Sequence, residues 1–547
     1  QNLADNRVPR LPDAGSDVQT VAIQRGGIQV DATSYGNPIT FAADGRPALA
    51  VDGDLETAWA TAAFSDARGE RIVLTLDEPL DLDHLDLFQL PEVRTTRAIT
   101  RVRVDVGDGR PVEVDLGASS RLPPGQRVDL GPRTTSRIEI TILADNLNEP
   151  MRYGDAGPVG FTDIGLGGSG PVLDEIIRMP VDLVDAMEAA DSDAARAAAL
   201  TYVMTRLRQD PTDRTREDEE RGIARLFRVP AARTFSLSGT ARLSGRAADP
   251  ILDDVLGVSS PDLQVTSSLR LSGSRIDRAS AALDGDLTTS WRSAFGRADG
   301  ESITVTTAEP RVFDHLDLVV VADGVHSVPT ALVVKVDGRV VATPTLPEVA
   351  DGEELGHTVA VPVDLPPTTG STLEVEVDRS RTVSSVDWTS VQPIDHPFAI
   401  AELGIDGLEV PAAAPTFDDR CRDDLVTVDG EAVSVRVVGS TVDALAGEPL
   451  GLEVCGGTDI DLAAGDHEVH ARPGVRTGID VDQLVLTAEP ADGAASAGVG
   501  EADPEGAGEL TVLASAPDHV RVSLDGLTPG EPVWLILGQS HTDGWVA

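Results

Sequence analysis

Apolar and polar residues alternate along most of the chain, a pattern typical of β-strands with one buried face. The alternation is clearest in VRVDVGDGRPVEVDL at 102–116 and in VVKVDGRVVATPTL at 333–346. Each stretch contains an Asp-Gly pair between two apolar runs, and such pairs favour the tight turn of a β-hairpin. The sequence therefore predicts a mainly β protein.

Between about residues 171 and 231 the apolar spacing changes to that of a helix. One such stripe consists of Leu200, Val203, Met204 and Leu207. A second, shorter stripe consists of Ile223, Leu226 and Phe227. We therefore expect a helical insert at 171–231, whose stripes pack between the flanking β regions.

Two segments of the chain occur twice. DGDLETAWAT at 52–61 returns as DGDLTTSWRS at 284–293, and DHLDLFQL at 83–90 returns as DHLDLVVV at 314–321. The spacing between the two segments is nearly the same in both copies, so the chain contains one module twice.

Similar strands close both copies. They are VGFTDIGLGG at 159–168 and FAIAELGIDGL at 398–408. We expect the first module to cover residues 18–170 and the second to cover 232–410, each as a β-sandwich with its own core.

The only two cysteines, Cys421 and Cys455, lie in one β-rich stretch after the second module. A disulfide between them would stabilise the fold by about 3.8 kcal/mol and would imply an oxidising compartment. Two buried free thiols are the alternative. We expect a β-sandwich-like domain at 415–490 that contains this pair. The small and acidic residues of 491–508 predict a flexible linker, and 509–547 is expected to be an incomplete β segment.

Charge narrows the set of partners. The 44 basic and 91 acidic residues give a net charge of −47, and such a surface repels phosphate backbones and anionic lipid headgroups. We expect no nucleic-acid partner, and contact with a membrane only through segments missing from this chain. No apolar stretch is as long as a membrane helix, and the first residues lack the pattern of a signal peptide. We therefore expect a chain that has been processed or cut from a longer protein.

Both repeats contain the motif A-x-D-G-D-x-x-T-x-W, at 50–59 and at 282–291. With this motif the chain resembles the F5/8 type C, or discoidin-like, family of jelly-roll β-sandwiches. In that family the segment forms a calcium loop, in which an Asp carboxylate, a Thr hydroxyl and backbone carbonyls are assisted by a carboxylate on the last strand. Calcium takes several oxygen ligands in loose geometry, and such a turn can supply them. A solvated Asp-Gly turn without a cation is the alternative.

The resemblance implies calcium ligands in each module. In the first module they are Asp52, Asp54 (through its carbonyl), Thr57 and the closing residue Asp163. In the second module they are Asp284, Asp286, Thr289 and the closing pair Ala401 and Glu402. Asp163 is one methylene shorter than Glu402, so we expect the first site to be the weaker.

Other conspicuous residues favour structural roles. Trp59 and Trp291 lie two residues beyond the ligand Thr, where the discoidin-like family packs the indole inward beneath the loop, so we expect both in the core. His467 and His470 would point to opposite faces of a strand and would not share a zinc ion. No nucleophile elbow, Walker loop, dinucleotide-binding glycine pattern or HExxH motif occurs. We therefore expect a non-catalytic chain.

The order of the expected parts resembles the soluble region of the actinobacterial α-(1→3)-arabinofuranosyltransferase D family. The most specific segments are TYVMTRLRQDP at 201–211 and RLFRVPAARTFSLSGTARLSG at 225–245. The resemblance implies a carbohydrate-binding region that holds arabinan or arabinogalactan near a membrane-embedded glycosyltransferase module absent from this chain. It also implies a location in the cell envelope, at the outer face of the plasma membrane.

Two other functions stay open at this point. The same modules could target a secreted glycoside hydrolase to polysaccharide, or could belong to a structural cell-surface adhesin. Apolar helices upstream would favour the transferase, whereas an upstream (β/α)₈ pattern would favour the hydrolase. The sequence does not identify the glycan, and the candidate loop residues are Phe64, Arg94, Arg97, Tyr153, Phe295 and His326.

Overall fold

Strands make up most of the structure. The computed structural model describes residues 15–36, 45–62, 66–90, 97–146, 157–168, 170–190, 198–208, 218, 220–386, 393–417, 420–457, 459–488, 509–516 and 519–526. Most described strands belong to one sheet of eleven strands and two sheets of seven, so the mainly β fold class is confirmed. No helix in these ranges is long and apolar enough to cross a membrane. The linker expected at 491–508 lies outside them.

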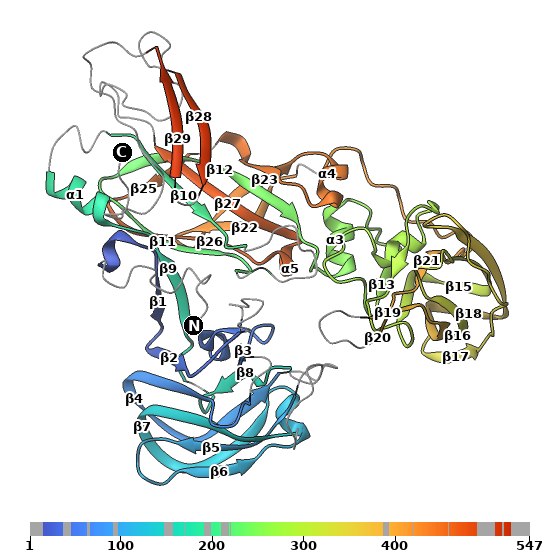
Figure 1. Cartoon of the computed structure of the whole chain (residues 1–547), viewed down its shortest axis with the longest axis horizontal. Coiled ribbons are helices and arrows are strands. Elements are labelled where there is room, and N and C mark those ends of the chain that lie inside the picture. Colours follow the sequence, from blue (N-terminus) through green and yellow to red (C-terminus); the bar gives the residue numbers. More distant parts are fainter. Residues whose placement is uncertain are drawn as a thin grey trace.

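The first module contains one seven-stranded sheet in the order β3-β8-β4-β7-β5-β6, with β2 paired to β4 (Figure 1). Its strands are β2 (Ile28–Ala32), β3 (Trp59–Ala60), β4 (Arg71–Gln89), β5 (Ile99–Asp105), β6 (Val112–Asp115), β7 (Gln126–Asp145) and β8 (Gly160–Gly165). Buried and exposed residues alternate along β4 and β5, as a half-buried strand requires.

The second module contains the same arrangement, with the order β14-β21-β15-β18-β16-β17 and with β13 paired to β15. Its strands are β13 (Leu263–Ser267), β14 (Trp291–Arg292), β15 (Ser302–Val321), β16 (Val328–Val336), β17 (Arg339–Ala342), β18 (Thr358–Arg381) and β21 (Ala399–Glu402). A small separate pair, β19 (Ser384–Val386) and β20 (Pro393–Asp395), lies beside it. The repeated sequence segments therefore fold into equivalent positions of two equivalent sheets.

A central domain carries both modules as insertions. Its sheet has the order β1-β9-β11-β26-β22-β23-β24-β12-β27-β10, with β25 paired to β12. Its strands are β1 (Val21–Arg25), β9 (Asp174–Arg178), β10 (Leu200–Thr205), β11 (Ile223–Val229), β12 (Arg233–Leu243), β22 (Arg422–Val428), β23 (Glu431–Val438), β24 (Leu450–Val454), β25 (Ile460–Leu462), β26 (Gly465–Ala471) and β27 (Ile479–Ala488). The first module is inserted between β1 and β9, and the second between β12 and β22.

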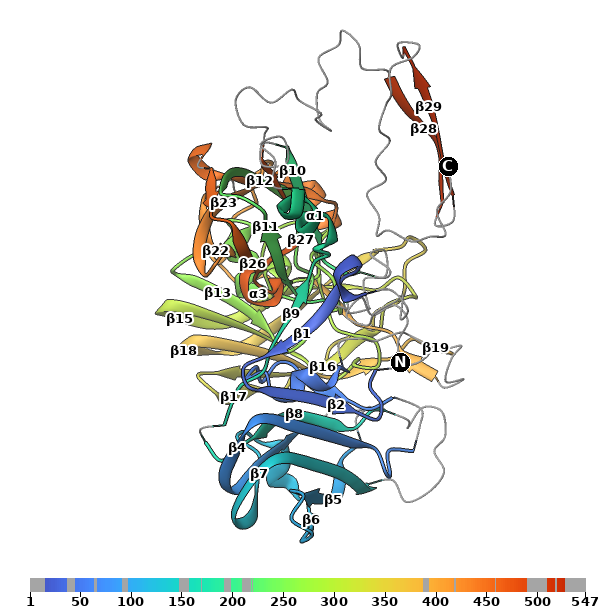
Figure 2. The ribbon, with the colours of Figure 1, turned by 90° about the vertical axis from the view of Figure 1, so that its left-hand side faces the viewer.

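The described helices are short and lie outside the sheets. They are α1 (Asp182–Ala190), α3 (Asp249–Val255), α4 (Thr441–Ala446) and α5 (Gly474–Thr477). The 3₁₀ turns η3 (Pro47–Ala50) and η6 (Ala279–Ala282) precede the two DGD turns. A hairpin of β28 (Glu509–Ala516) and β29 (His519–Asp525) pairs only with itself, and Figure 2 shows it standing apart from the central sheet.

The helices expected around Leu200 and Ile223 are wrong, because both segments are strands. In β10 the side chains of Tyr202 and Met204 are buried, whereas Val203 is 48% exposed, which is the two-residue period of a strand. In β11 one of the buried positions is Arg225. A charged residue at a buried position obscures the alternation of apolar and polar residues in the sequence. Both segments form strands because they pair with other strands of the central sheet.

The domain expected at 415–490 is likewise only part of a larger unit. Strands β22 to β27 share one sheet with strands that precede the second module, and β12, expected inside that module, pairs with β24 and β27. Residues far apart in the sequence thus complete one fold, which local patterns cannot reveal.

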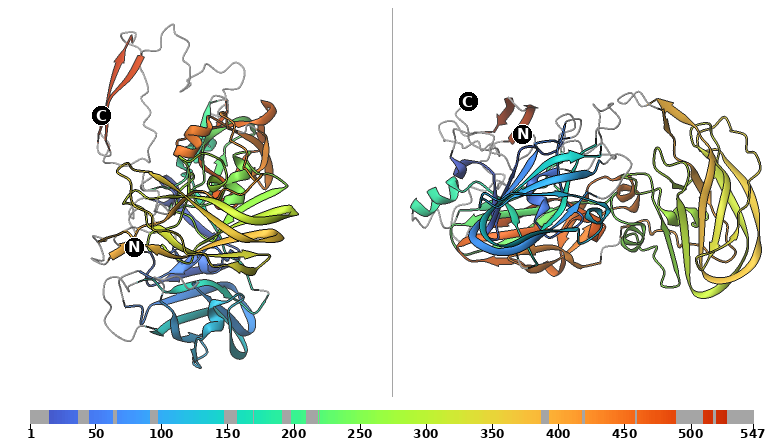
Figure 3. Two further views of the ribbon diagram at one scale, coloured as in Figure 1. Left: turned by 90° about the vertical axis from the view of Figure 1, so that its right-hand side faces the viewer. Right: turned by 90° about the horizontal axis from the view of Figure 1, so that it is seen from below.

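The two modules are attached to the central domain differently. The buried side chains of the central domain and the second module form one continuous apolar cluster, which includes Leu252 and Val255 of α3. The first module has a separate core. Figure 1 and the right-hand view of Figure 3 show the second module at one end of the molecule and the first on another side of the central domain.

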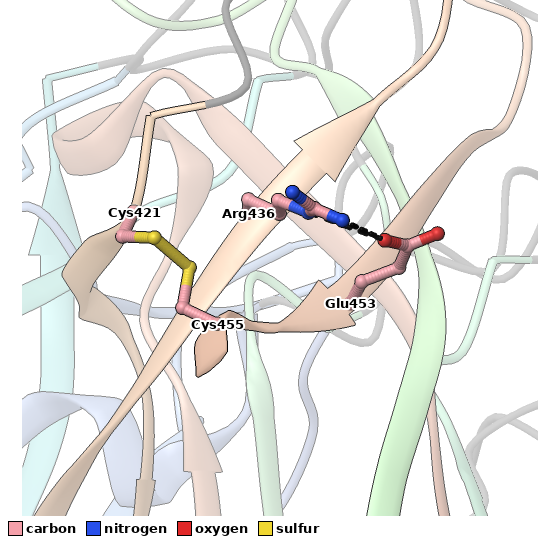
Figure 4. The surroundings of a disulfide bond; sticks show 4 residues. All are labelled: Cys421, Arg436, Glu453 and Cys455. Atoms are coloured by element: carbon pink, nitrogen blue, oxygen red, sulfur yellow. Dashed lines mark hydrogen bonds and ion pairs between the residues drawn. A yellow bond between two sulfur atoms is a disulfide. The ribbon is translucent and has the colours of Figure 1, made fainter. Parts of the chain in front are cut away.

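The predicted disulfide is confirmed. Cys421 and Cys455 are bonded, with their Cα atoms 6.0 Å apart. Cys421 precedes β22 and Cys455 follows β24, so the bond joins the two strands on either side of β23 (Figure 4). Arg436 of β23 donates a hydrogen bond of 2.8 Å to Glu453 of β24 beside it.

Candidate functional site

In the first module the DGD turn gathers oxygen atoms around one hydroxyl. Thr57 Oγ1 lies 3.0 and 2.8 Å from the two carboxylate oxygens of Asp52, 2.8 Å from the carbonyl of Asp54 and 3.4 Å from the carbonyl of Leu49. The Asp54 N–H donates to Asp52 Oδ1 at 3.0 Å and fixes the turn. Gly53 between them has φ of 74°, a conformation that glycine adopts without strain.

The second module reproduces this cluster almost atom for atom. Thr289 Oγ1 lies 2.9 Å from each carboxylate oxygen of Asp284, 2.8 Å from the carbonyl of Asp286 and 3.3 Å from the carbonyl of Ala281. The Asp286 N–H donates to Asp284 Oδ1 at 3.0 Å. The repeat is therefore a repeat of geometry as well as of sequence.

These clusters contain more oxygens than their hydrogens can satisfy. A threonine hydroxyl has one proton and can donate one hydrogen bond, yet four acceptor oxygens surround it in each module. Backbone N–H groups of the turn satisfy part of this acceptor capacity, because Asp54 N–H donates to Asp52 and Asp286 N–H donates to Asp284. A carboxylate, a hydroxyl and two backbone carbonyls are also the donor types that a hard cation such as calcium prefers.

The predicted closing carboxylates occupy equivalent places. Asp163 of β8 pairs with Phe88, and Glu402 of β21 pairs with Val319, at matching positions of the two sheets. Glu402 reaches the turn directly, because its Oε2 accepts a hydrogen bond of 3.1 Å from the Gly285 N–H.

The shorter Asp163 is close enough to interact electrostatically with Asp52. Burial, followed by the neighbouring charge of Asp52, raises the pKa of Asp163 to about 6. Burial likewise raises the pKa of Asp52, Asp284 and Glu402. Each module therefore holds two carboxyl groups whose charged forms are destabilised and which a proton or a cation would neutralise.

The donor set has few acidic side chains. Within the described ranges no group of three or more His, Cys, Asp or Glu side chains is placed to hold a metal. Each DGD site instead combines two carboxylates with neutral oxygens, so it fits a hard, oxygen-loving cation rather than zinc. Ala401 lies next to Glu402 and is fully buried with Ala399 and Val321, so its side chain has a packing role.

The two turns differ in what covers them. In the first module Arg476 of α5 donates to Asp54 Oδ1 at 2.6 Å and to Glu56 Oε2 at 3.3 Å. Arg221, which precedes β11, donates to the Glu56 carbonyl at 2.6 Å. In the second module the Asp286 carboxylate accepts hydrogen bonds from its own turn, from the N–H and hydroxyl of Thr288. The first turn is thus held by arginines of the central domain, and sequence reading gave no sign of Arg221 or Arg476.

Other predicted residues have structural positions. Trp59 and Trp291 are fully buried, and their indole N–H groups donate to the carbonyls of Ser34 at 2.9 Å and Leu269 at 3.0 Å. They pack against the rings of Phe161 and Phe398 respectively.

The two histidines of HEVH are in different environments. His467 is buried between Asp429 and the carbonyl of Ala463, at 2.7 and 2.9 Å, whereas His470 is half-exposed and lies 3.3 Å from Glu468.

The candidate loop residues separate into three groups. Arg97 is buried and pairs with Asp145 at 2.9 Å, and His326 is buried beside Asp323. Phe295 is 49% exposed and meets the ring of His396 edge-on. Outside the described residues lie Phe64, Arg94 and Tyr153.

Comparison with known proteins identifies the class of the first module. Residues 30–172 match the family described as "Arabinofuranosyltransferase D, third carbohydrate binding module". This segment is therefore similar to carbohydrate-binding modules of that type. The whole chain is related to arabinofuranosyltransferase D, as the relatives below indicate.

A relative covers almost the whole chain. The α-(1→3)-arabinofuranosyltransferase of Mycolicibacterium smegmatis is 24% identical over 99% of this chain and 39% of its own length. A cryo-EM structure of arabinofuranosyltransferase AftD from Mycobacteria gives a TM-score of 0.60 at 18% identity, covering 87% of this chain and 36% of the other. A mutant of that protein gives 0.61 at 18% identity, covering 95% and 40%. The chain thus spans about two fifths of the relatives it matches, and the solved structures share its fold.

Proposed function

We propose that this chain is the non-catalytic carbohydrate-binding region of a cell-wall arabinofuranosyltransferase. Its modules would hold arabinan or arabinogalactan acceptor near a membrane-embedded catalytic module that this chain lacks. The observation that carries the proposal is the match of residues 30–172 to a carbohydrate-binding module of arabinofuranosyltransferase D, within a chain related to that protein over nearly its full length. The repeated sheet order of the second module supports a second binding unit.

Location follows from the same argument. A disulfide persists in an oxidising compartment, and the bond between Cys421 and Cys455 closes 34 residues of the central domain. The net charge of −47 disfavours nucleic acid and anionic lipid as partners, whereas a neutral polysaccharide is not repelled. We therefore place the chain outside the cytoplasm, in the cell envelope at the outer face of the plasma membrane.

Calcium is the proposed cofactor of both DGD sites. In the first module it would be held by Asp52, Thr57, the Asp54 carbonyl and Asp163. In the second module it would be held by Asp284, Thr289, the Asp286 carbonyl and the Ala401-Glu402 pair. Bound there, a divalent cation would neutralise the buried carboxylates and fix the turn above the core tryptophan. Its role would be structural, since the cation-binding oxygens come from the turn and the last strand.

A direct binding experiment tests the function. The 1–547 protein is titrated calorimetrically with arabinofuranosyl oligosaccharides and with maltooligosaccharides of equal length as the composition control. Each titration is performed in calcium and again in chelator. We expect weak, selective binding of the arabinose glycans, and no transfer of arabinose from a polyprenyl donor. Equal binding of both glycan types, or binding of neither, would contradict the proposal.

A further inference from the structure

The first module meets the central domain through charged groups, and these groups frame a cavity. Besides the contacts of Arg221 and Arg476, Arg46 of the first module pairs with Glu175 of β9. The Leu173 N–H also donates to the Val51 carbonyl at 2.8 Å, next to the DGD turn. Ion pairs and hydrogen bonds of arginine side chains thus join the two walls of the cavity.

The cavity is small and partly open to solvent, with a volume of about 240 Å³. The first module contributes Arg46, Leu49, Asp54 and Thr57 to its lining, so the cavity reaches the DGD turn. The central domain contributes Ile177, Ile223 and His470 among others. Ligand sites occur preferentially where two domains meet, as here.

The chemistry of the lining favours a neutral polyhydroxylated ligand. Both Arg46 and Glu175 line the cavity and are paired with each other, and the Asp54 carboxylate is paired with Arg476. Glu220 also lines the cavity and is paired with Arg225, so each acidic side chain of the lining has an arginine partner. Paired carboxylate and guanidinium groups still have hydrogen-bonding capacity for hydroxyls, and Leu49 and Ile223 offer apolar surface to the C–H groups of a sugar.

We propose that the junction of the first module with the central domain is a saccharide-binding site that takes one residue of a neutral furanoside glycan. This inference rests on the proposed carbohydrate-binding function. It adds a site that neither the first module nor the central domain possesses alone. His470 is the polar group best placed to be tested, because it is half-exposed and its ring lies 3.3 Å from Glu468 of the same strand.

The test uses the full chain with two cavity variants and one matched control. Ala224→Phe places a ring at the cavity wall on β11, and His470→Ala removes a polar group from β26. Leu226→Phe places the same ring two residues further along β11, at a position that does not line the cavity. Melting curves establish that each variant is folded. Binding of methyl arabinofuranoside and of a short arabinofuranosyl oligosaccharide is then measured by ligand-observed NMR and calorimetry.

We expect Ala224→Phe to weaken oligosaccharide binding by about tenfold or to remove one site, and His470→Ala to weaken it several-fold. Leu226→Phe should bind as the unaltered chain does. If both cavity variants bind with unchanged affinity and stoichiometry, the site is elsewhere and this inference is wrong, while the proposed function stands. If the unaltered chain binds no glycan, the proposed function fails and the inference fails with it. Should Ala224→Phe not fold, His470→Ala decides the question.

Discussion

The two modules have the same sheet order and the same DGD turn, yet different kinds of contact join them to the central domain. The second module shares one continuous apolar core with the central domain, through α3 and its buried Leu252 and Val255. The first module keeps a separate core and touches the central domain through Arg46, Arg221 and Arg476.

The difference shows two ways to attach an inserted module. A fused module shares an apolar core with its host domain, whereas a docked module keeps its own core and contacts the host through polar groups. A shared apolar core makes two parts unfold together, because burial stabilises both at once. The pair of Arg476 with Asp54 is partly exposed, and exposed ion pairs contribute little free energy and are screened by salt, whereas the pair of Arg46 with Glu175 is largely buried. We therefore expect the second module to behave as part of the central domain, and the first as a separate unit whose placement can be adjusted.

The largest expected effect concerns the disulfide. Replacing Cys421 and Cys455 by serine should lower the free energy of unfolding of the central domain by about 3.8 kcal/mol, because the unfolded chain regains the freedom of the closed loop. Calorimetry of the full chain should show the transition of the central domain and second module moving down together. The transition of the first module should not move, and a shift of all transitions by the same amount would contradict the separation of cores.

A substitution in the shared apolar core also tests whether the central domain and the second module unfold together. Leu252 is fully buried in α3, so Leu252→Ala should cost about 3 kcal/mol. Its effect should again appear in one transition that includes the second module. The control is Leu74→Ala, a fully buried leucine of the first module, which should lower the other transition alone. Two independent transitions for the central domain and the second module would show that the continuous core does not couple them.

The two DGD turns provide the third comparison. A ligand that binds only the folded state raises stability by about 2.7 kcal/mol at a hundredfold excess over its dissociation constant. Calcium should raise the melting temperature of both transitions, and more in the second, where Glu402 reaches the turn. Asp284→Ala should abolish the larger shift and Asp52→Ala the smaller. If neither transition responds to calcium or chelator, the DGD segments are turns over buried tryptophans and no more.

Sequence reading recovered what short segments encode. The repeat located both modules, and the resemblance to the discoidin-like family placed Trp59 and Trp291 in the core, as the structure confirms. The disulfide followed from two cysteines in one β-rich stretch. The metal ligands stay a prediction, although the oxygens converge as that prediction requires.

The central domain could not be predicted, because its strands pair across inserted modules. β12 meets β27 although more than two hundred residues separate them, and no local pattern records such a pairing. Arg225 interrupts the alternation of apolar residues in β11. It can be buried because its guanidinium donates hydrogen bonds of 2.8 and 3.0 Å to the two carboxylate oxygens of Glu220. The contacts of Arg221 and Arg476 with the first turn are equally invisible, since each is one arginine among many exposed ones.

A pH dependence should distinguish the first loop from the second. The pKa of Asp163 is raised to about 6, above its ordinary value of 3.8, so between these pH values the folded state binds more protons than the unfolded state. Its contribution therefore makes the first module less stable as the pH rises through this window, and the full penalty is present above pH 6. In chelator the first module of the unaltered chain should melt higher at pH 5 than at pH 7.5, relative to Asp163→Asn, which lacks the titrating group. Added calcium should remove that difference, and an identical pH profile for both proteins in chelator would refute it.

The smallest effect on stability is expected at the docking contact itself. Arg476 is half-exposed, and removing it in Arg476→Ala should change the free energy of unfolding by less than about 1 kcal/mol. What should change is orientation, since Asp54 and Glu56 both lose the guanidinium that ties them to α5. Small-angle scattering should show a wider range of placements for the first module, and raising the salt concentration should produce the same change in the unaltered chain. Arg436→Ala is the matched control, because it removes a similarly exposed arginine whose partner, Glu453, lies within the central domain. That variant should scatter like the unaltered chain. If Arg476→Ala instead lowers a melting transition as much as Leu252→Ala does, the first module is fused after all, and the contrast between the two modules disappears.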